Sequence, residues 1–567
     1  MKPARTFDAS SNPSPAPDSS QHLIPEALNG IDTRRKIVTP FPCCLTDPQH
    51  WKDEGRRDIQ RAWTLRPEYG VAKNTILYIG DGMGLQSVTA GRIYKGQKMG
   101  RSGEEYKLSF EDFPYTGLSK TYNVDRQVAD SAGTAVAMVS GVKANLGTLG
   151  VTSEVAYGKS CDTYSDSRRV VTALDYALQE GKSVGLITTT RVTHATPAAI
   201  YAHTPFRDWE SDTNMDGITG CDEVKDIAYQ LVMDNPNIQV VLGGGRRSFL
   251  NNTTPDPRTG QISSSQRKDG LDLIEEWKKD KAARDENHSH VFTKGQFDAV
   301  DPDSTDYLLG LFSSSHMSYE LERDSTADGQ PSLAEMVDKA IRILKRNEKG
   351  FFLLVEGGRI DHAHHDNLGK LALGDMDAFD EAVKKGKEMT STRDTLIIVT
   401  ADHSHVFGMA GYPSRGNPIL GLVDIVVPEE APYDDMPYTT LTYSNGPSYE
   451  RVNYTGVDIT GNRFTQQAGL GMQWETHAGE EVPIYARGPM AHLFHTTHEQ
   501  SYIGHVIMYA SCYGLYKNDC DLNRREEMLS GPPPCAAILG QRVSPIAFCL
   551  VAFITLSTAT RKLFSFH

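Results

Sequence analysis

Residues 351–365 read FFLLVEGGRIDHAHH, an apolar run followed by two glycines and a cluster of metal-binding residue types. The run at 351–355 predicts a buried strand. Carboxylate oxygen and imidazole nitrogen, which follow it, are donors that zinc prefers. Asp361 and His365 are four residues apart, so a helix that begins after Gly358 would place both on one face. The stretch predicts a strand that delivers metal ligands, and the alternative is a solvated polar loop.

Three further apolar runs, at 75–79, 183–188 and 395–399, predict strands that also end in polar residues. Amphipathic patterns elsewhere, such as 332–346 and 371–387, predict helices. Short buried strands that alternate with helices indicate an α/β fold with a large, mostly parallel central sheet and helices on both faces. The polar residues at the carboxyl ends of these strands are Asp81, Thr196, Glu356, Asp361, Asp402 and His403.

These polar residues are expected to converge, because ligands of open α/β sheets bind at the carboxyl edge of the strands. Asp81 alone, in the turn Gly80-Asp81-Gly82, is read more simply as a capping residue. Together, so many carboxylates would repel one another unless cations held them. Their number exceeds what one ion needs, so we infer two or three metal ions. Two-metal sites suit in-line displacement at phosphorus.

Ser131 begins a run of small and then apolar residues, 131–138, that predicts a buried helix. A serine at this position is commonly a helix N-cap. The positive end of a helix also binds phosphate and favours an anion. A nucleophilic serine placed there would meet a phosphoryl group, so both interpretations stay open from the residues alone.

Composition places the chain among ordinary globular proteins and argues against a nucleic-acid partner. It has 567 residues, 39% hydrophobic and 23% charged, with a net charge of −15 and no basic block. A small anionic substrate is compatible with this charge, because metal ions and one arginine can dominate the local field. Eight cysteines without a CxxC pair argue against zinc–thiolate sites.

Composition along the chain predicts three parts. Residues 1–40 read as a disordered extension without a signal-peptide h-region. Residues 41–520 read as one large folded domain, in which 412–473 are an insertion rich in Pro, Gly, Tyr and Asn; the resemblance described below implies that this domain is catalytic. Residues 521–567 read as a linker and hydrophobic tail, either a lipid-anchor signal or a plain apolar C-terminus. Four glycosylation sequons, a weak sign of secretion, start at Asn251, Asn252, Asn287 and Asn453.

Six motifs in order resemble those of animal, membrane-anchored alkaline phosphatases over roughly residues 40–520. They are 80–84 (GDGMG), 130–135 (DSAGTA), 194–197 (HATP), 355–365 (VEGGRIDHAHH), 400–405 (TADHSH) and 475–480 (ETHAGE). The resemblance implies a large α/β fold with a small crown-like insertion. It also implies hydrolysis of phosphate monoesters through a phosphoserine at alkaline pH. A homodimer, anchored by lipid at the extracellular face of the cell membrane, is implied as well.

The resemblance further implies a role for each matching residue. Ser131 would be the nucleophile, and Arg207 would hold two phosphate oxygens in the bidentate way that suits a guanidinium. Two zinc ions and one magnesium ion are expected. The implied ligands are Asp361, His365 and His477 for one zinc, Asp81, Asp402 and His403 for the other, and Asp81, Thr196 and Glu356 for magnesium. His194 and His362 would lie near the magnesium and the phosphate, and His405 would support the ligands.

The chain also departs from this family. Animal members often bind calcium, but Ser313 and Arg258 stand where two glutamates are expected, beside matching Phe312 and Asp328. Losing two carboxylates would weaken such a site, so no calcium is predicted. Two cysteine pairs match disulfides of the family, and Cys43 and Cys44 match nothing. The matching pairs are Cys161–Cys221 and Cys512–Cys520.

Two alternatives remain. The chain could be another metal-dependent hydrolase of the same superfamily, such as a phosphodiesterase, sulfatase or phosphomutase, although these mostly differ at the nucleophile and lack the segment around Arg207. It could instead be a non-catalytic extracellular binding protein, which a substitution at Ser131, Arg207 or a ligand would indicate. None is present. His492, His495 and His498 are interpreted as ordinary loop or core residues.

Overall fold

The computed structural model describes residues 46–424 and 431–519, which fall into two compact units that meet between residues 63 and 64. The first is described only by α1 (Pro48–Thr64) and the residues before it. The predicted 1–40 extension, the hydrophobic tail, Cys43, Cys44 and Cys520 all lie outside the described residues. The boundaries predicted at 41, 412, 473 and 520 stay predictions. The second unit carries the fold described below.

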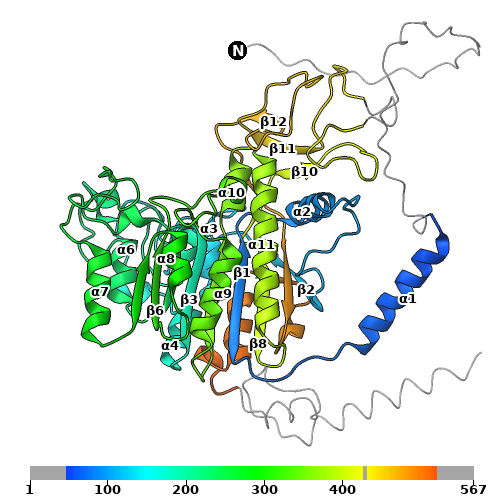
Figure 1. The fold of residues 1–567 in the computed structure, drawn as a ribbon. Helices are drawn as coiled ribbons and strands as arrows, with labels where there is room; N and C mark the ends of the chain where they lie inside the picture. The colour runs from blue at the N-terminus through cyan, green and yellow to red at the C-terminus, as the bar shows by residue number, and fades with distance from the viewer. Residues whose placement is uncertain (1–45, 425–430, 520–567) are drawn as a thin grey trace, which may run out of the picture. The chain divides into compact units, whose positions relative to one another are not determined.

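A ten-stranded sheet forms the centre of the second unit (Figure 1). Its order is β15-β2-β14-β8-β1-β7-β3-β4-β6-β5, and β14 alone among these strands runs antiparallel to both neighbours. The strands are β1 (Asn74–Gly80), β2 (Tyr115–Lys120), β3 (Ser183–Arg191), β4 (Val240–Gly244), β5 (His288–Val291), β6 (Tyr307–Leu311), β7 (Phe351–Gly357), β8 (Thr395–Thr400), β14 (Val482–Arg487) and β15 (Thr497–Glu499). The predicted α/β class with a mostly parallel sheet is confirmed.

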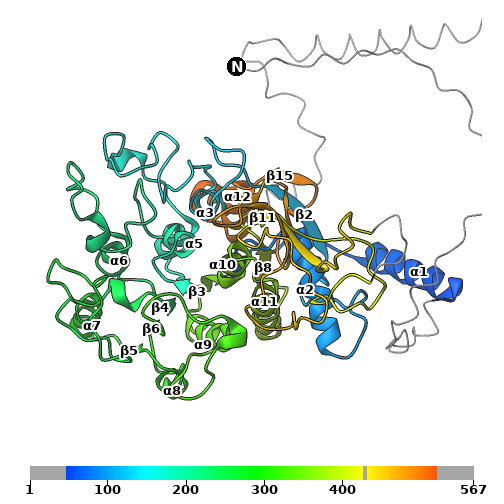
Figure 2. The ribbon, with the colours of Figure 1, turned by 90° about the horizontal axis from the view of Figure 1, so that it is seen from above.

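Helices cover both faces of the sheet, as Figure 2 shows from above. Alternate residues of β1 explain the two layers: Leu77 and Ile79 enter the core on one face, Ile76 and Tyr78 on the other. The first core includes α3 (Ser131–Ser140), α4 (Ala173–Gln179), α5 (Ala195–Ala198), α6 (Ile227–Tyr229), α7 (Leu273–Ala283) and α12 (Tyr502–Ser511). The second includes α8 (Lys294–Ala299), α9 (Leu333–Leu344) and α11 (Gly369–Met389), while α2 (Leu85–Lys98) and α10 (Arg359–His365) start near the carboxyl edge.

Local sequence explains where key helices begin. Ser332 starts α9 with a capping box, because its side chain accepts from the Glu335 amide and the Glu335 carboxylate accepts from the Ser332 amide. Asp130, rather than Ser131, is the N-cap of α3 and accepts from the amides of Ala132 and Gly133. The N-cap interpretation of Ser131 is therefore wrong, and its hydroxyl is free of that role.

The structure also has two small sheets, and Figure 1 shows the three-stranded one beyond the carboxyl edge of the large sheet. One consists of β10 (Phe407–Met409), β11 (Leu441–Gly446) and β12 (Ala468–Gly471), and falls largely within the predicted insertion. The other pairs β9 (Ser404–His405) with β13 (His477–Ala478), and sets His405 opposite His477. This second pairing joins two segments that are far apart in the sequence and carry candidate metal ligands.

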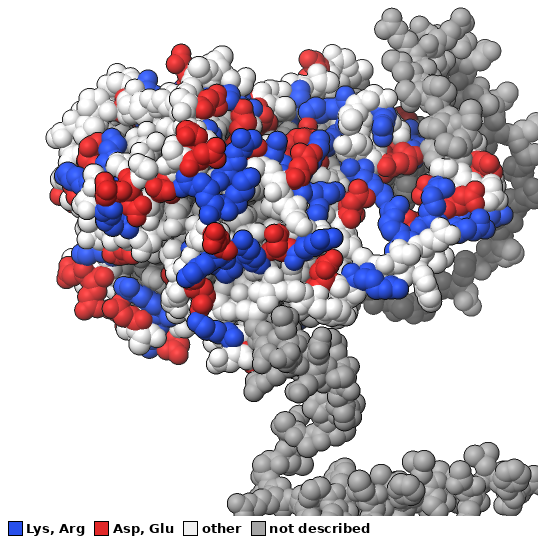
Figure 3. Space-filling model, turned by 60° about the horizontal axis from the view of Figure 1, so that its bottom comes forward, with Lys and Arg blue, Asp and Glu red and all other residues white. Residues whose placement is uncertain are grey.

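Acidic and basic side chains are interspersed on the face seen in Figure 3, and neither sign forms a large separate patch there. Among residues 46–424 and 431–519, no helix combines the length and the apolar character needed to cross a bilayer.

Candidate metal centre

The register of the central strands brings the candidate ligands to one place. Ile79 of β1 pairs with Glu356 of β7 on one side and with Thr400 of β8 on the other. Asp81, two residues past Ile79, therefore lies beside Glu356, and Asp402 lies at the same level beyond β8. Because the three strands are parallel neighbours, their carboxyl ends deliver these carboxylates to a common edge.

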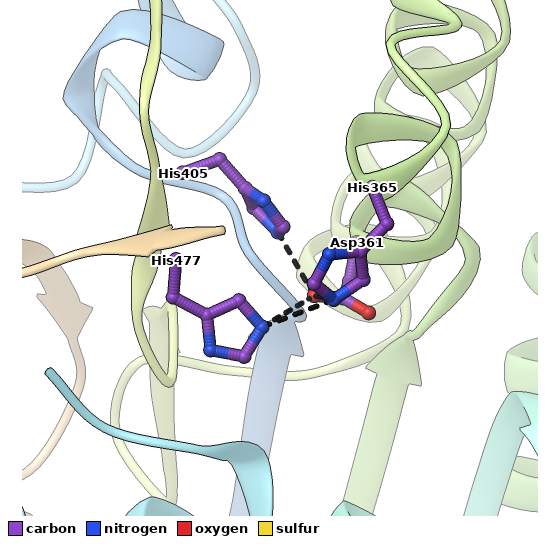
Figure 4. A group of neighbouring side chains, drawn as sticks. All are labelled: Asp361, His365, His405 and His477. Atoms are coloured by element: carbon purple, nitrogen blue, oxygen red, sulfur yellow. Dashed lines mark hydrogen bonds and ion pairs between the residues drawn. The ribbon is translucent and has the colours of Figure 1, made fainter. Parts of the chain in front are cut away.

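We call Asp361, His365, His405 and His477 the Asp361 group; they can offer one ligand atom each, all within 4.8 Å of one another. Figure 4 shows the three imidazoles pointing toward the Asp361 carboxylate. Its Oδ1 lies 2.8 Å from His405 Nε2, 3.3 Å from His477 Nε2 and 3.4 Å from His365 Nε2. The helix predicted after Gly358 is α10, and it places Asp361 and His365 together as the four-residue spacing requires.

We call Asp81, Asp402 and His403 the Asp81 group; all three are fully buried. His403 Nε2 lies 3.2 Å from Asp402 Oδ2 and 3.5 Å from Asp81 Oδ1. Asp402 Oδ1 accepts from the amides of Gly82 and His403, at 3.0 and 2.9 Å. Both oxygens of Asp81 and Oδ2 of Asp402 have no hydrogen-bond partner. Buried carboxylate oxygens without donors fit a site that a cation completes.

Electrostatics separate the two groups. Burial, followed by the charges of nearby carboxylates, raises the pKa of Asp81 well above its ordinary value. Burial alone would also raise the pKa of Asp361, but the imidazoles of His365, His405 and His477 hold it well below the ordinary range. The pKa of His405 moves the other way: despite burial, Glu475 and Asp361 raise it to about 10.

Asp81 also belongs to a third set with His194 and Glu356, which we call the Glu356 group. Burial raises the pKa of Glu356 to about 7, although hydroxyl groups that include those of Thr188 and Thr190 act against the rise. Glu356 Oε2 accepts from both threonines, whereas Oε1 has no hydrogen-bond partner.

His194 Nδ1 and Thr196 Oγ1 are also buried without hydrogen-bond partners. The set of closely spaced ligand atoms thus contains His194, and the Thr196 hydroxyl, expected from the sequence as a ligand, lies beside Glu356. Carboxylate and hydroxyl oxygens suit magnesium, and the added imidazole nitrogen would also suit a softer cation.

Ser131 is the first residue of α3 and lies against the Asp81 group, with its Oγ 3.2 Å from His403 Nε2. Arg207 reaches the same point from another segment. Its Nη1 donates to Asp130 Oδ2 at 3.0 Å, and its Nη2 lies 3.1 Å from His194 Nε2. The nucleophile candidate, the arginine and the carboxylate groups are therefore adjacent, an arrangement suited to an oxyanion that carries several charges.

Comparison with known proteins gives the family. The family model for alkaline phosphatase matches residues 72–513. The chain belongs to the alkaline phosphatase family. It is 46% identical over 527 residues to the tissue-nonspecific alkaline phosphatase of Rattus norvegicus, covering 90% of this chain and 98% of that protein. It is 46% identical over 485 residues to an alkaline phosphatase of Gadus morhua, covering 84% and 99%. The predicted family and enzyme class, a phosphoric monoester hydrolase, are confirmed.

Solved alkaline phosphatases have the same fold. The Thermus thermophilus enzyme superposes with a TM-score of 0.56 at 25% identity, over 78% of this chain and 92% of that one. The enzyme of the Antarctic bacterium TAB5 gives 0.54 at 21% identity, over 79% and 99%. The carboxyl edge that carries the three groups is thus the edge of an alkaline phosphatase sheet.

Two residues that the sequence reasoning missed contact the centre of this alkaline phosphatase. His316 packs its ring 4.2 Å from that of His362 and 5.3 Å from that of His194, between centroids, and contacts Arg191. Glu475 lies between His405 and His365. His316 belongs to no motif that could have indicated it. Glu475 is the first residue of the 475–480 motif, but the resemblance implied no role for it.

The region where the family often binds calcium contains an arginine in this alkaline phosphatase. Arg258 donates from Nη1 to the Phe312 carbonyl at 3.2 Å and from Nη2 to the Asp328 carbonyl at 2.5 Å. A guanidinium therefore lies where the expected glutamates would otherwise have supplied negative charge. The chain provides a positive group of its own in this region.

The Cys161–Cys221 disulfide, expected from the resemblance, is present. It packs with Trp209 and Phe206 in a small apolar cluster. Because Phe206 directly precedes Arg207, this cluster supports the segment that carries the arginine.

Proposed function

We propose that this alkaline phosphatase hydrolyses phosphate monoesters through a covalent phosphoserine at Ser131. The observation that carries the proposal is the 3.2 Å approach of Ser131 Oγ to His403 Nε2 in the Asp81 group, at the first turn of α3. The candidate nucleophile Ser131 thus lies next to the carboxylates of the Asp81 group and at the positively charged N-terminal end of α3.

We propose two zinc ions, one in the Asp361 group with His405 as support, and one in the Asp81 group. Magnesium would take Asp81, Thr196 and Glu356, with His194 beside it. The donor types and the unpartnered buried oxygens support this assignment. Zinc bound there would lower the pKa of a coordinated hydroxyl or water and neutralise phosphate charge.

The chain's own residues would act in two displacements. Ser131 Oγ forms a bond to phosphorus as the bond from phosphorus to the alcohol oxygen breaks, and the alcohol leaves with a proton. Water then attacks phosphorus from the opposite side. The bond from phosphorus to Ser131 breaks, the serine hydroxyl is restored, and inorganic phosphate leaves.

Arg207 would hold two phosphate oxygens through both displacements, and His194 and His362 would border the phosphate. The Arg207 side chain is oriented by the Asp130 carboxylate, which also caps α3, so the arginine and the nucleophile share one anchor. A rapid second displacement at high pH would give the alkaline optimum implied by the family.

Hydrolysis of a chromogenic phosphate monoester between pH 7 and 10 tests this function. We expect zinc- and magnesium-dependent turnover that is lost with chelator and with Ser131→Ala. A folded, zinc-loaded protein without monoester turnover would contradict the proposal, and turnover of diesters or sulfate esters instead would favour another enzyme of the superfamily.

We also propose that the chain is a glycosylated homodimer at the extracellular face of the cell membrane, held by a lipid anchor. The curated relatives are animal enzymes, and the sequon residues Asn252, Asn287 and Asn453 are exposed. A glycosidase shift on gels, release by a phospholipase and light scattering test the three parts separately.

A further inference from the structure

Glu475 is a buried carboxylate at the back of the Asp361 group, and no role has been assigned to it so far. Its side chain is 1% exposed, whereas Trp474 before it is exposed. The residue lies on the segment that leads to His477, and it contacts two other members of the group, His365 and His405.

The backbone of Glu475 fixes the proton position on His365. Its amide donates to the His365 carbonyl at 3.0 Å, and its own carbonyl lies 2.6 Å from His365 Nδ1. A carbonyl can only accept, so Nδ1 carries the proton and Nε2 of the neutral ring presents a lone pair. The Ala129 carbonyl, 2.7 Å from His477 Nδ1, does the same for His477.

These two tautomers direct two lone pairs toward each other, an arrangement that suits a cation. The Nε2 atoms of His365 and His477 are 3.1 Å apart, and in the neutral rings neither carries a proton to donate to the other. Both also face Asp361 Oδ1. Two lone pairs and a carboxylate oxygen directed at one point are the donors of a zinc site.

The side chain of Glu475 orients the remaining ligand through His405. Glu475 Oε2 lies 2.5 Å from His405 Nδ1, and His405 Nε2 lies 2.8 Å from Asp361 Oδ1. Glu475 Oε1 accepts from the Val406 amide at 2.8 Å, so the carboxylate itself cannot rotate freely. The contacts from the Glu475 carboxylate to the His405 imidazole, and from that imidazole to the Asp361 carboxylate, thus fix the rotamer of Asp361.

The segment is in turn held by the small three-stranded sheet. Asn445 of β11 accepts from the Thr476 amide at 3.0 Å and donates to the Thr476 hydroxyl at 2.9 Å. This pair of hydrogen bonds fixes the residue between Glu475 and His477. The insertion therefore reaches the metal centre through Thr476 and Glu475.

We propose that Glu475 is a positioning residue for the zinc of the Asp361 group: it fixes His365 through its backbone and Asp361 through His405. The proposal rests on the proposed function, because it requires that this group bind zinc. It assigns Glu475 no contact with substrate. Its effect is to hold two ligands, His365 and Asp361, in place before the cation arrives, which increases affinity for the cation.

The test compares Glu475→Gln with Glu475→Ala and with Glu481→Gln, a matched control on the same segment whose side chain is exposed. Zinc alone is titrated into the metal-stripped full chain against a competing chelator. We expect one of two zinc ions to bind roughly 10- to 100-fold more weakly in Glu475→Gln, with the other unchanged. Glu475→Ala should lose at least as much, and Glu481→Gln should match the unsubstituted enzyme.

Two further measurements distinguish positioning from a general structural role. Urea unfolding of the stripped proteins should give Glu475→Gln a single cooperative transition whose midpoint lies somewhat below that of the control, because the buried contact of the Glu475 carboxylate with His405 is weakened while the backbone bonds remain. In a double-mutant cycle with His405→Gln, the zinc affinities should be non-additive, since Glu475 acts on Asp361 through His405. At saturating zinc, kcat of Glu475→Gln should recover.

Zinc affinity of Glu475→Gln equal to that of the control would overturn the proposal and leave the proposed function intact. Equal weakening of both zinc ions, or loss of the cooperative urea transition, would also overturn it, because the role would then be structural. An unsubstituted enzyme that binds no zinc would instead contradict the proposed function.

Discussion

The Asp361 group and the Asp81 group lie side by side at one sheet edge, yet their carboxylates differ in hydrogen bonding and in the direction of their pKa shifts. In the first, His405 donates to the Asp361 carboxylate, the other two imidazoles lie beside it, and the pKa of Asp361 stays low. In the second, three buried carboxylate oxygens have no hydrogen-bond partner, and the pKa of Asp81 is raised. One group is assembled by protein contacts in advance, and the other depends on cations to balance its charge.

This difference follows from position. The Asp81 group stands directly on the ends of the central strands β1 and β8, where residues are fully buried and the hydrogen bonds to the Asp402 carboxylate come from backbone amides. The Asp361 group is built from a helix turn and the small β9–β13 pair, which bring side-chain donors. The nucleophile candidate Ser131 contacts the group that depends on cations.

The largest effect should come from Ser131→Ala, which removes the nucleophile beside the Asp81 group. Turnover of a phosphate monoester should fall by roughly 10⁴-fold or more. Zinc content should stay near two ions per chain, because the carboxylates and His403 remain. Ser140→Ala, in the same helix and bonded only locally to the Val136 and Val142 segments, is the control. Substantial turnover in Ser131→Ala would refute the nucleophile assignment.

Asp402→Asn should act in opposite directions in the loaded and the stripped protein. With metal present, turnover should fall by roughly 10²-fold or more, because a ligand is lost. With metal removed, the variant should be about 1–2 kcal/mol more stable, because one of two clustered buried charges disappears. Kinetics and urea unfolding of both forms check this. His365→Asn, in the Asp361 group, should gain no stability when metal is removed. An equal gain in both metal-free variants would contradict the proposed difference between the Asp81 and Asp361 groups.

Arg207→Lys should weaken binding of inorganic phosphate by roughly 10- to 100-fold, measured as product inhibition of the loaded enzyme. The lysine keeps the charge but loses the planar pair of donors. Arg247→Lys, an arginine outside the centre, should leave inhibition unchanged. Equal inhibition of the Arg207→Lys and unsubstituted enzymes would show that the arginine does not hold phosphate.

Asp375 is a buried carboxylate that belongs to none of the three candidate metal-binding groups, so it offers a comparison with Asp81 and Asp402. It lies in α11, accepts from the Glu320 amide at 3.1 Å, and burial raises its pKa to about 8. Between the ordinary pKa near 4 and pH 8, the unfolded chain binds fewer protons than the folded one, so stability falls as pH rises. Asp375→Asn should match the unsubstituted protein near pH 4 and exceed it by up to about 5 kcal/mol above pH 8. Urea unfolding across this pH range measures the gain in stability, and a gain that did not change with pH would contradict the prediction.

Arg258 should give the smallest effect, in a region where the chain supplies its own cation. Arg258→Ala removes donors to two carbonyls and should cost about 1–2 kcal/mol of unfolding free energy. Added calcium should not raise the thermal midpoint of the unsubstituted enzyme. A clear rise with calcium would show that a cation site persists beside the arginine.

The central strands and α10 could be predicted from sequence because their signals are local. An apolar run of five residues and a four-residue spacing suffice for β7 and for the pairing of Asp361 with His365. The antiparallel strand β14 was not predicted as such, because strand direction depends on which neighbours it meets. Ser131 could be singled out, but its freedom from the cap depended on Asp130 taking that role.

Glu475 and His316 could not be identified from sequence, because their roles arise only in three dimensions. Glu475 contacts residues 70 and 110 positions away in the chain. His316 meets His194 and His362 across two other strand ends. Likewise, the resemblance implied Thr196 as a ligand, while the side-chain positions added His194 to the same set.

A crystal structure with zinc and magnesium, phased to show anomalous scattering at the zinc edge, tests the two-group arrangement most directly. We predict two strong zinc peaks per chain, one among Asp361, His365 and His477 and one among Asp81, Asp402 and His403. A third density without a zinc signal should lie beside Asp81, Thr196 and Glu356. A single zinc peak, or zinc bound outside these groups, would contradict it.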